Sequence, residues 1–293
     1  MKAIETKNLT KYYGKNRGIV DVNLSVEQGD FYGFIGPNGA GKSTTIRTLL
    51  GLLNPSAGEG KIFGLDIVKD RTEILSKVGY MPSEAAFYSG MRVKEALEFS
   101  AALRKKDCRK EADILCQRLE LDRSKKVGEL SLGNRKKVSI VCALQHEPEL
   151  YILDEPTSGL DPLMQKEFYD ILKERNEKGA TVFLSSHVLS EVARYCRYAA
   201  VIRDGRILAA DKTENLGHTG AKQVRLRGLG EVPGLEGIQN AVWDEKTLQF
   251  LYSGDIRLLL GELAKQPVED LTITDTDLEE SFLHYYEKEG DEK

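Results

Sequence analysis

The feature that most constrains this sequence is a glycine-rich segment between two apolar stretches. Residues 36–44 read GPNGAGKST and fit the pattern GxxxxGK[ST]. The apolar run 31–35 precedes them, and the leucine and isoleucine side chains of residues 46–53 follow at helical spacing. A strand, a glycine loop and a helix in this order predict a phosphate-binding loop (P-loop), because the loop amides and the positive end of the helix dipole can face one anion.

Each position of the P-loop has an expected part in binding a nucleoside triphosphate. The pattern predicts that Lys42 reaches the terminal phosphates, that Ser43 ligates Mg²⁺ and that Thr44 adds a hydroxyl contact. The glycines let successive backbone N–H groups curl around phosphate oxygens. The expected nucleotide-binding residues of this loop are Gly36, Asn38, Gly39, Ala40, Gly41, Lys42, Ser43 and Thr44.

Two carboxylates end a second apolar run. Residues 150–155 read LYILDE, so that Asp154 and Glu155 lie where a buried strand would finish. Ligands of parallel sheets bind at this end of the strands. Beside a P-loop we expect Asp154 to hold the Mg²⁺ shell and Glu155 to polarise an attacking water as the catalytic base. The competing interpretation is an acidic pair that caps the following helix.

A histidine follows a third apolar run in the same way. His187 comes directly after residues 181–186 and would project from the same edge of the sheet as Lys42 and Asp154. A solitary histidine is most often a polar loop residue. Its place at this edge favours a catalytic role, in which a neutral imidazole contacts the γ-phosphate or the attacking water.

The order of these elements predicts an α/β fold, with a P-loop NTPase core built on a parallel sheet. Residues 84–145 change to helical spacing and predict an inserted helical subdomain. A break at residues 217–220 separates a domain spanning residues 1–216 from a small α+β C-terminal domain spanning residues 217–293. The latter is expected to end in a helix opened by Thr276.

Composition excludes several classes of protein. The 293 residues carry a net charge of −4, which gives no reason to expect nucleic-acid binding, and we interpret the basic run 135–137 as a solvated helix face. No segment has the apolar length of a signal peptide or a membrane span. The four cysteines have no metal-ligand spacing and fit a reducing compartment. We therefore expect a soluble intracellular chain.

Several ordered motifs between residue 1 and about residue 211 resemble the ATP-binding subunits of ATP-binding cassette (ABC) transporters. Residues 130–134, LSLGN, are similar to the signature segment of that family, and residues 158–161, SGLD, to the loop that joins two ATP sites across a dimer. His187 matches the switch histidine, and Tyr13 matches the aromatic residue that stacks on adenine. The resemblance implies that Ser131 and Gly133 bind the ATP held by a second subunit.

Two departures from the family pattern affect the predicted site. Leu132 and Asn134 replace a glycine and a glutamine of the usual signature, and such Ser-Leu-Gly forms occur in relatives that resemble antibiotic exporters. Residues 78–84, VGYMPSE, resemble the switch loop whose glutamine binds Mg²⁺, but Ser83 occupies that position. Either Ser83, Glu84 or a water must then complete the metal shell.

The resemblance implies a subunit that binds and hydrolyses ATP with Mg²⁺. Two copies, or this chain and a relative, would enclose two ATP molecules as a homodimer or heterodimer. They would drive a separate transmembrane permease, contacted through residues 82–90, and the direction of transport would be export. The expected location is cytoplasmic, peripheral on the inner face of the cell membrane. The alternatives are a soluble ABC-type ATPase that acts on the ribosome or DNA, and a weakly hydrolysing regulatory module.

Overall fold

The predicted strand, loop and helix lie at the centre of the structure. In the computed structural model, which describes residues 1–84, 86–217 and 222–275, strand β4 (Phe31–Ile35) is buried along its whole length. Helix α1 (Lys42–Leu49) begins directly after the glycine loop and buries Ile46 and Leu49. The residue range predicted for the strand is therefore correct, because an apolar run with no alternation is typical of a strand covered on both faces.

A six-stranded sheet surrounds β4 in the order β11-β10-β4-β9-β8-β7. The pairs β10 with β4, β4 with β9, β9 with β8 and β8 with β7 are parallel. The carboxyl ends of β4, β8 and β9 consequently meet at one edge, which confirms the predicted α/β fold and its parallel sheet. The other strands are β7 (Val78–Met81), β8 (Leu150–Asp154), β9 (Thr181–Ser186), β10 (Tyr198–Arg203) and β11 (Arg206–Lys212).

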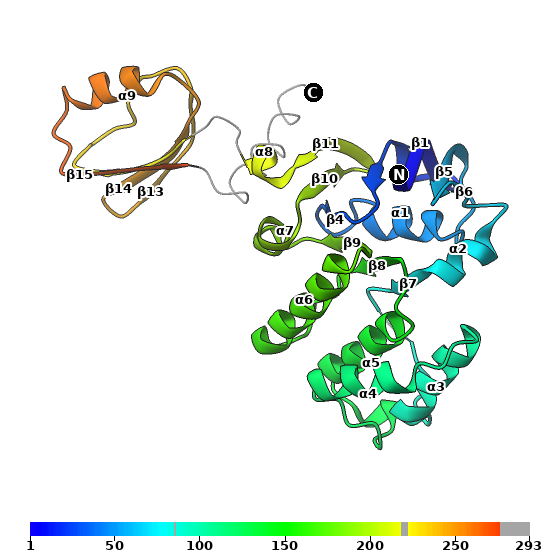
Figure 1. The fold of residues 1–293 in the computed structure, drawn as a ribbon. Coiled ribbons are helices and arrows are strands. Elements are labelled where there is room, and N and C mark those ends of the chain that lie inside the picture. Colours follow the sequence, from blue (N-terminus) through cyan, green and yellow to red (C-terminus); the bar gives the residue numbers. More distant parts are fainter. Residues whose placement is uncertain (85, 218–221, 276–293) are drawn as a thin grey trace. The chain divides into compact units, whose positions relative to one another are not determined.

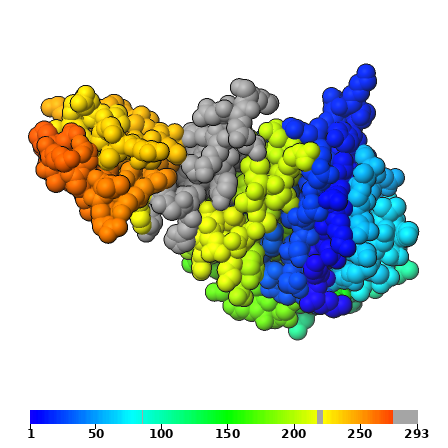
Figure 2. All heavy atoms as spheres, turned by 90° about the horizontal axis from the view of Figure 1, so that it is seen from above, coloured from blue at the N-terminus to red at the C-terminus, as the bar shows by residue number. Residues whose placement is uncertain are grey.

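A second, antiparallel sheet packs over this core and was not predicted from the sequence. Its strand order is β2-β1-β5-β6, and β3 pairs with β1. Figure 2 shows β1, in blue, beside the cyan segment that contains β5 and β6. This sheet brings Tyr13, at the end of β1, toward the start of α1. Its strands are β1 (Lys2–Tyr13), β2 (Asn16–Val22), β3 (Ser25–Glu27), β5 (Ala57–Ile62) and β6 (Leu65–Asp66).

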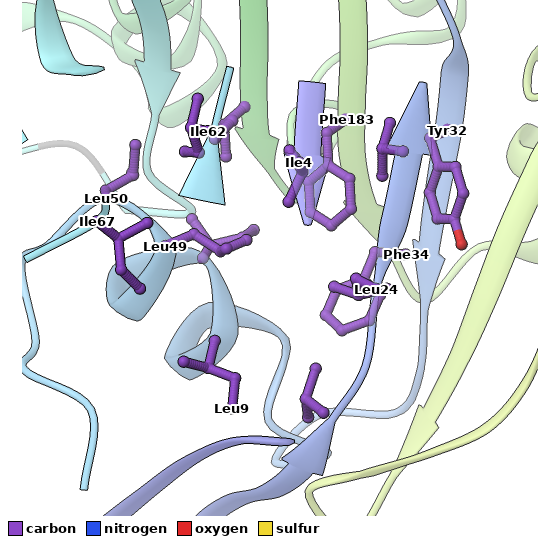
Figure 3. Close-up of a cluster of buried hydrophobic side chains, with 14 of the residues drawn as sticks. Ile4, Leu9, Leu24, Tyr32, Phe34, Leu49, Leu50, Ile62, Ile67 and Phe183 are labelled. Atoms are coloured by element: carbon purple, nitrogen blue, oxygen red, sulfur yellow. The ribbon is translucent and has the colours of Figure 1, made fainter. Parts of the chain in front are cut away.

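Helix α1 lies between the two sheets and shares one apolar core with them (Figure 1). Figure 3 shows Ile4 of β1, Leu49 of α1 and Phe183 of β9 in this cluster. Phe183 also packs against Phe34 of β4, with ring centroids 5.4 Å apart. The core therefore anchors the first turn of α1, and with it the glycine loop, on both sides.

Helices α3, α4 and α5 gather beside β7 and confirm the predicted helical character of residues 84–145 (Figure 1). Helix α5 packs against α3, α4 and β7, and its N-cap Ser131 accepts a hydrogen bond from the backbone N–H of Asn134. The helices of this first unit are α2 (Arg71–Lys77), α3 (Val93–Leu103), α4 (Arg109–Arg118), α5 (Leu132–Leu144), α6 (Pro162–Glu177) and α7 (Leu189–Tyr195), with a 3-10 turn η1 (Val127–Glu129).

The chain divides into two compact units, Met1–Asp211 and Lys212–Lys293. In the second unit a four-stranded antiparallel sheet, in the order β13-β14-β12-β15, buries Val224 and Phe250 against Leu259 of helix α9. The final helix expected from Thr276 lies outside the described residues. No helix within the described ranges is both long enough and apolar enough to cross a membrane. The elements of this unit are α8 (Thr213–Gly217), β12 (Lys222–Arg227), β13 (Ile238–Asp244), β14 (Thr247–Tyr252), α9 (Ile256–Leu263) and β15 (Asp270–Asp275).

One buried histidine ties the helical subdomain to the sheet. His146 follows α5, is 4% exposed, and its Nε2 lies 3.4 Å from the carbonyl oxygen of Val78 at the start of β7. Its Nδ1 has no hydrogen-bond partner among the described residues. Burial, together with the positive charges of Arg104 and Lys106, lowers the pKa of His146 to about 4. The folded chain therefore holds this ring neutral at pH 7.

We predict that His146 makes the protein sensitive to mild acid. Because the unfolded chain takes up this proton near pH 6.5 and the folded chain only near pH 4, the free energy of unfolding should fall by about 3 kcal/mol between pH 7 and pH 4. Urea denaturation at several pH values measures the free energy of unfolding. His146→Gln should flatten this part of the profile, and an identical pH dependence in both proteins would contradict the prediction.

Candidate nucleotide site

The glycine loop begins at the buried end of β4 and ends in the first turn of α1. Gly36 donates its N–H to the carbonyl of Ser186 at the end of β9, and Ala40 donates its N–H to the carbonyl of Pro37, which closes a turn within the loop. Gly41 has a φ of 110°, a conformation that side chains with a Cβ rarely adopt. Pro37, Asn38 and Gly39 form the exposed rim of the loop.

Lys42 is a buried cation with three oxygen partners. Its Nζ donates to the carbonyl oxygens of Gly36, at 2.5 Å, and Pro37, at 3.2 Å, and lies 3.0 Å from Oε1 of Glu155. Only 5% of the residue is exposed. A buried ammonium needs such partners to offset its lost hydration. A phosphate group reaching this loop would compete with these oxygens for the same charge.

Asp154 lies at the end of β8 with its carboxylate completely buried. Its Oδ1 accepts a hydrogen bond from Oγ of Ser185, at 2.5 Å. Its Oδ2 has no hydrogen-bond partner among the described residues. A buried carboxylate oxygen without a partner is costly, and a divalent cation would satisfy it. The donor set of Asp154 and Ser43 therefore fits the hard, oxygen-preferring Mg²⁺.

Glu155 follows immediately, and its backbone N–H and both carboxylate oxygens have partners. Its backbone has a φ of 49°, and its N–H is shared between the carbonyl and the hydroxyl oxygens of Ser185, both at 3.2 Å. Its Oε2 lies 2.8 Å from Nδ1 of His187, which extends from the end of β9. The carboxylate is thus fixed between Lys42 and His187, with only 14% of the side chain exposed. Such a strained backbone is typical of functional sites.

A cavity of about 280 Å³ opens over Lys42 and Glu155 and brings together most of the predicted residues, although Asp154 and His187 are not among its lining residues. Tyr13 stands at its edge, with its hydroxyl 3.4 Å from Oγ1 of Thr44. Arg17 and Gly18 of β2 also line it, although no sequence signal singled them out. The predicted residues that line the cavity are Tyr13, Asn38, Gly39, Gly41, Lys42, Ser43, Thr44, Ser83 and Glu155.

Ser131 and Gly133 do not line this cavity. They lie at the amino end of α5. The carbonyl oxygen of Gly159 packs against Gly133: a Cβ added to Gly133 would lie only 2.7 Å from that oxygen. This contact places the LSLGN segment against the loop of residues 158–161. The chain therefore presents two separate groups of predicted ATP-binding residues, one in the cavity and one at the start of α5.

The basic run on α5 contradicts the expectation of a solvated face. Lys136 and Lys137 are 5% and 7% exposed, because α5 is covered by neighbouring elements on nearly all sides. The Nζ of Lys136 donates to the carbonyl of Ser83, at 2.8 Å. Burial lowers the pKa of Lys136, and the charges of Asp154, Glu155 and Glu84 oppose that shift. Ser83 therefore accepts a hydrogen bond from a lysine that interacts electrostatically with Asp154 and Glu155.

Comparisons with known proteins agree with this geometry. The sequence profile of the ABC transporter family matches residues 19–158. The bacitracin transport ATP-binding protein BcrA of Bacillus licheniformis is 41% identical over 212 residues, 70% of this chain and 68% of that protein. The linearmycin resistance ATP-binding protein LnrL of Bacillus subtilis is 33% identical over 237 residues, 78% of this chain and 76% of that protein. A dimeric bacterial ABC transporter cassette of known structure is 28% identical, has a TM-score of 0.66, and is matched over 72% of this chain and 98% of that one.

The fold and the site therefore define a P-loop ATPase, and the chain belongs to the ATP-binding subunits of ABC transporters. Members of this family bind ATP and hydrolyse it to power transport. The resemblance inferred from the P-loop, the LYILDE strand and the LSLGN segment is confirmed.

We predict that Ser185 stabilises the two carboxylates of the site. Ser185→Ala would remove the hydrogen bond to buried Asp154 and one of the two acceptors of the Glu155 N–H. The free energy of unfolding should fall by about 1 to 3 kcal/mol, measured by chemical denaturation. Ser190→Ala, at an exposed hydroxyl nearby, is the matched control. Equal stability of the two variants would contradict this role.

Proposed function

We propose that this chain binds Mg·ATP in the cavity between Tyr13 and the glycine loop, and that Glu155 is the base of its hydrolysis. The observation that carries the proposal is the position of the Glu155 carboxylate between Lys42 and His187, next to Asp154 with its unpaired buried oxygen. P-loop enzymes that transfer phosphoryl groups use a lysine at the amino end of a helix, a carboxylate that holds Mg²⁺ and a group that orients the attacking water.

Different residues of the cavity would bind different parts of ATP. Tyr13 would stack on the adenine ring, while the loop amides and Lys42 would bind the phosphates. Gly36 and Ala40 lie on the buried side of the loop and would contribute by fixing its backbone conformation. Bound Mg²⁺ would supply positive charge to the phosphate oxygens, and Ser43 and Asp154 would hold it, with Ser83, Glu84 or a water completing the shell.

Hydrolysis would use the pair formed by Glu155 and His187. Once a phosphate takes over the charge of Lys42, the Oε1 atom of Glu155 is released to accept a hydrogen bond from the attacking water. His187 would keep its contact with Oε2 of Glu155 and so hold the orientation of the carboxylate. The exposed side of the His187 ring would face the γ-phosphate. The proton would move from the water to Glu155.

One chain would supply only part of each site. Ser131 and Gly133 lie away from the cavity of their own chain, at a helix amino end suited to binding a phosphate. We propose that they complete the ATP site of a second subunit, either identical or a relative. The dimeric cassette of known structure, which covers most of the first unit, supports this arrangement. No nucleic acid is required.

A second hollow marks the surface proposed for the membrane partner. It has a volume of about 330 Å³ and lies between the switch loop and the start of α5. Within the loop of residues 82–90, Ala85 lies outside the described residues, while Ala86 and Phe87 line the hollow with Leu132. Polar and charged side chains complete the lining, namely Ser83, Glu84, Ser89, Arg135 and Lys136. A hollow with apolar side chains among polar ones can accept a short amphipathic helix. Here we place a separate transmembrane permease, which would hold the chain on the inner, cytoplasmic face of the cell membrane.

The direction of transport is proposed to be export. The LSLGN form of the signature and the similarity to proteins named for bacitracin transport and linearmycin resistance support it. The substrate would be bound by the permease. The sequence assigns residues 217–293 to a second domain. We propose that this domain takes part in dimerisation or regulates the closure of the dimer around ATP.

We predict that Glu155→Gln retains ATP binding but lowers steady-state turnover at least about 100-fold, because the amide cannot take the proton of the water. Phosphate release measures turnover, and titration with a fluorescent ATP analogue measures binding. Glu177→Gln, at the exposed end of α6, is the control. Normal turnover in the Glu155 variant would refute the assigned base.

We predict that the tagged chain, captured from detergent-solubilised membranes of its native cell, retains a polytopic membrane protein at comparable abundance. Mass spectrometry identifies it. Phe87→Asp should abolish the capture by placing a charge in the proposed docking hollow, whereas Leu260→Asp on α9 should not. Ribosomal or DNA-associated proteins in place of a membrane protein would overturn the transport assignment.

A further inference from the structure

Glu191, on helix α7, accepts three hydrogen bonds at a single carboxylate oxygen. Its Oε2 lies 3.0 Å from Oγ1 of Thr157, 2.9 Å from the hydroxyl of Tyr169 and 3.3 Å from Oγ of Ser186. The three donors come from the turn after β8, from α6 and from the end of β9. Neither the P-loop nor the signature motif pointed to this residue.

Two of these donors stand beside the proposed catalytic pair. Thr157 comes two residues after Glu155, and Ser186 comes immediately before His187. Ser186 also accepts the backbone N–H of Val188, at 2.9 Å, so both flanks of His187 are held. Glu191 consequently links the backbone segments that carry the base and the histidine, whose side chains meet at 2.8 Å.

The anchor of this linkage is buried and closely packed. Thr157, Tyr169 and Ser186 are at most 5% exposed. The ring of Tyr169 stacks on Tyr195 of α7, with centroids 3.8 Å apart and an interplanar angle of 8°. Burial, followed by the charge and the hydrogen bond of Glu191, raises the pKa of Tyr169, so this hydroxyl remains a donor. Hydrogen bonds to a charged acceptor are stronger than neutral ones.

We propose that Glu191 is a positioning residue that fixes Glu155 and His187 relative to each other. It does not line the cavity and would act only through Thr157 and Ser186. A shift of about 1 Å between a base and its partner can cost about 100-fold in rate, while binding contacts elsewhere persist. The inference rests on the function proposed for Glu155 and His187.

The test compares Glu191→Ala, Glu191→Gln and Ser190→Ala in the full-length chain. Glu191→Ala should lower kcat for ATP about 10- to 100-fold. Its KM, its affinity for a fluorescent ATP analogue and the number of binding sites per chain should stay within about 2-fold of the parent, since the glycine loop is untouched. Glu191→Gln keeps an oxygen acceptor and should recover most of kcat. Ser190→Ala, at the exposed neighbour, should equal the parent.

Other outcomes overturn the inference. An unchanged kcat in Glu191→Ala would remove the positioning role. A fall in the number of ATP sites that matches the fall in kcat would show a folding defect, and equal losses in the Gln and Ala variants would show that the acceptor oxygen does not matter. Failure of the proposed function appears separately, as normal turnover in Glu155→Gln.

Discussion

The buried ammonium of Lys42 is the interaction on which the site depends. It is held by the carbonyl oxygens of the glycine loop and by the Glu155 carboxylate, so one cation joins the P-loop to the end of β8. These oxygens offset the hydration free energy that the ammonium loses on burial. The negative oxygens of a triphosphate could pair with the Lys42 ammonium in the same way. Bound triphosphate would then free the Glu155 carboxylate, which is proposed to activate water.

The parallel sheet makes this arrangement possible. Strands β4, β9 and β8 are adjacent and parallel, so the loop carrying Lys42, the histidine after β9 and the carboxylates at the end of β8 lie at one edge of the sheet. Ser185 donates a hydrogen bond to Asp154, and Glu191 accepts one from Ser186, the residue before that histidine. Residues far apart in sequence thus share one hydrogen-bonded network at the sheet edge.

Much of the first unit was predictable because its strands are buried on both faces and carry their polar groups at their ends. The positions of Asp154, Glu155 and His187 at the sheet edge follow from that pattern, while the P-loop follows from its glycine motif between a strand and a helix. The roles of these residues stay predictions. The antiparallel sheet was missed because β1 alternates irregularly along its length, and its partners lie before and after α1 in the sequence. Lys136 was misjudged because a cation covered by several elements has no local signature. Ser185 and Glu191 act through pairings of distant segments, which residue spacing does not reveal.

The most direct measurement is a high-resolution structure of the Glu155→Gln chain with ATP and Mg²⁺. The account predicts that Nζ of Lys42 leaves the carbonyls of Gly36 and Pro37 for the phosphate oxygens, and that Mg²⁺ contacts Ser43 and the free oxygen of Asp154. It also predicts that Ser131 and Gly133 of one chain meet the nucleotide of another. A nucleotide bound elsewhere, with Lys42 still on the loop carbonyls, would contradict it.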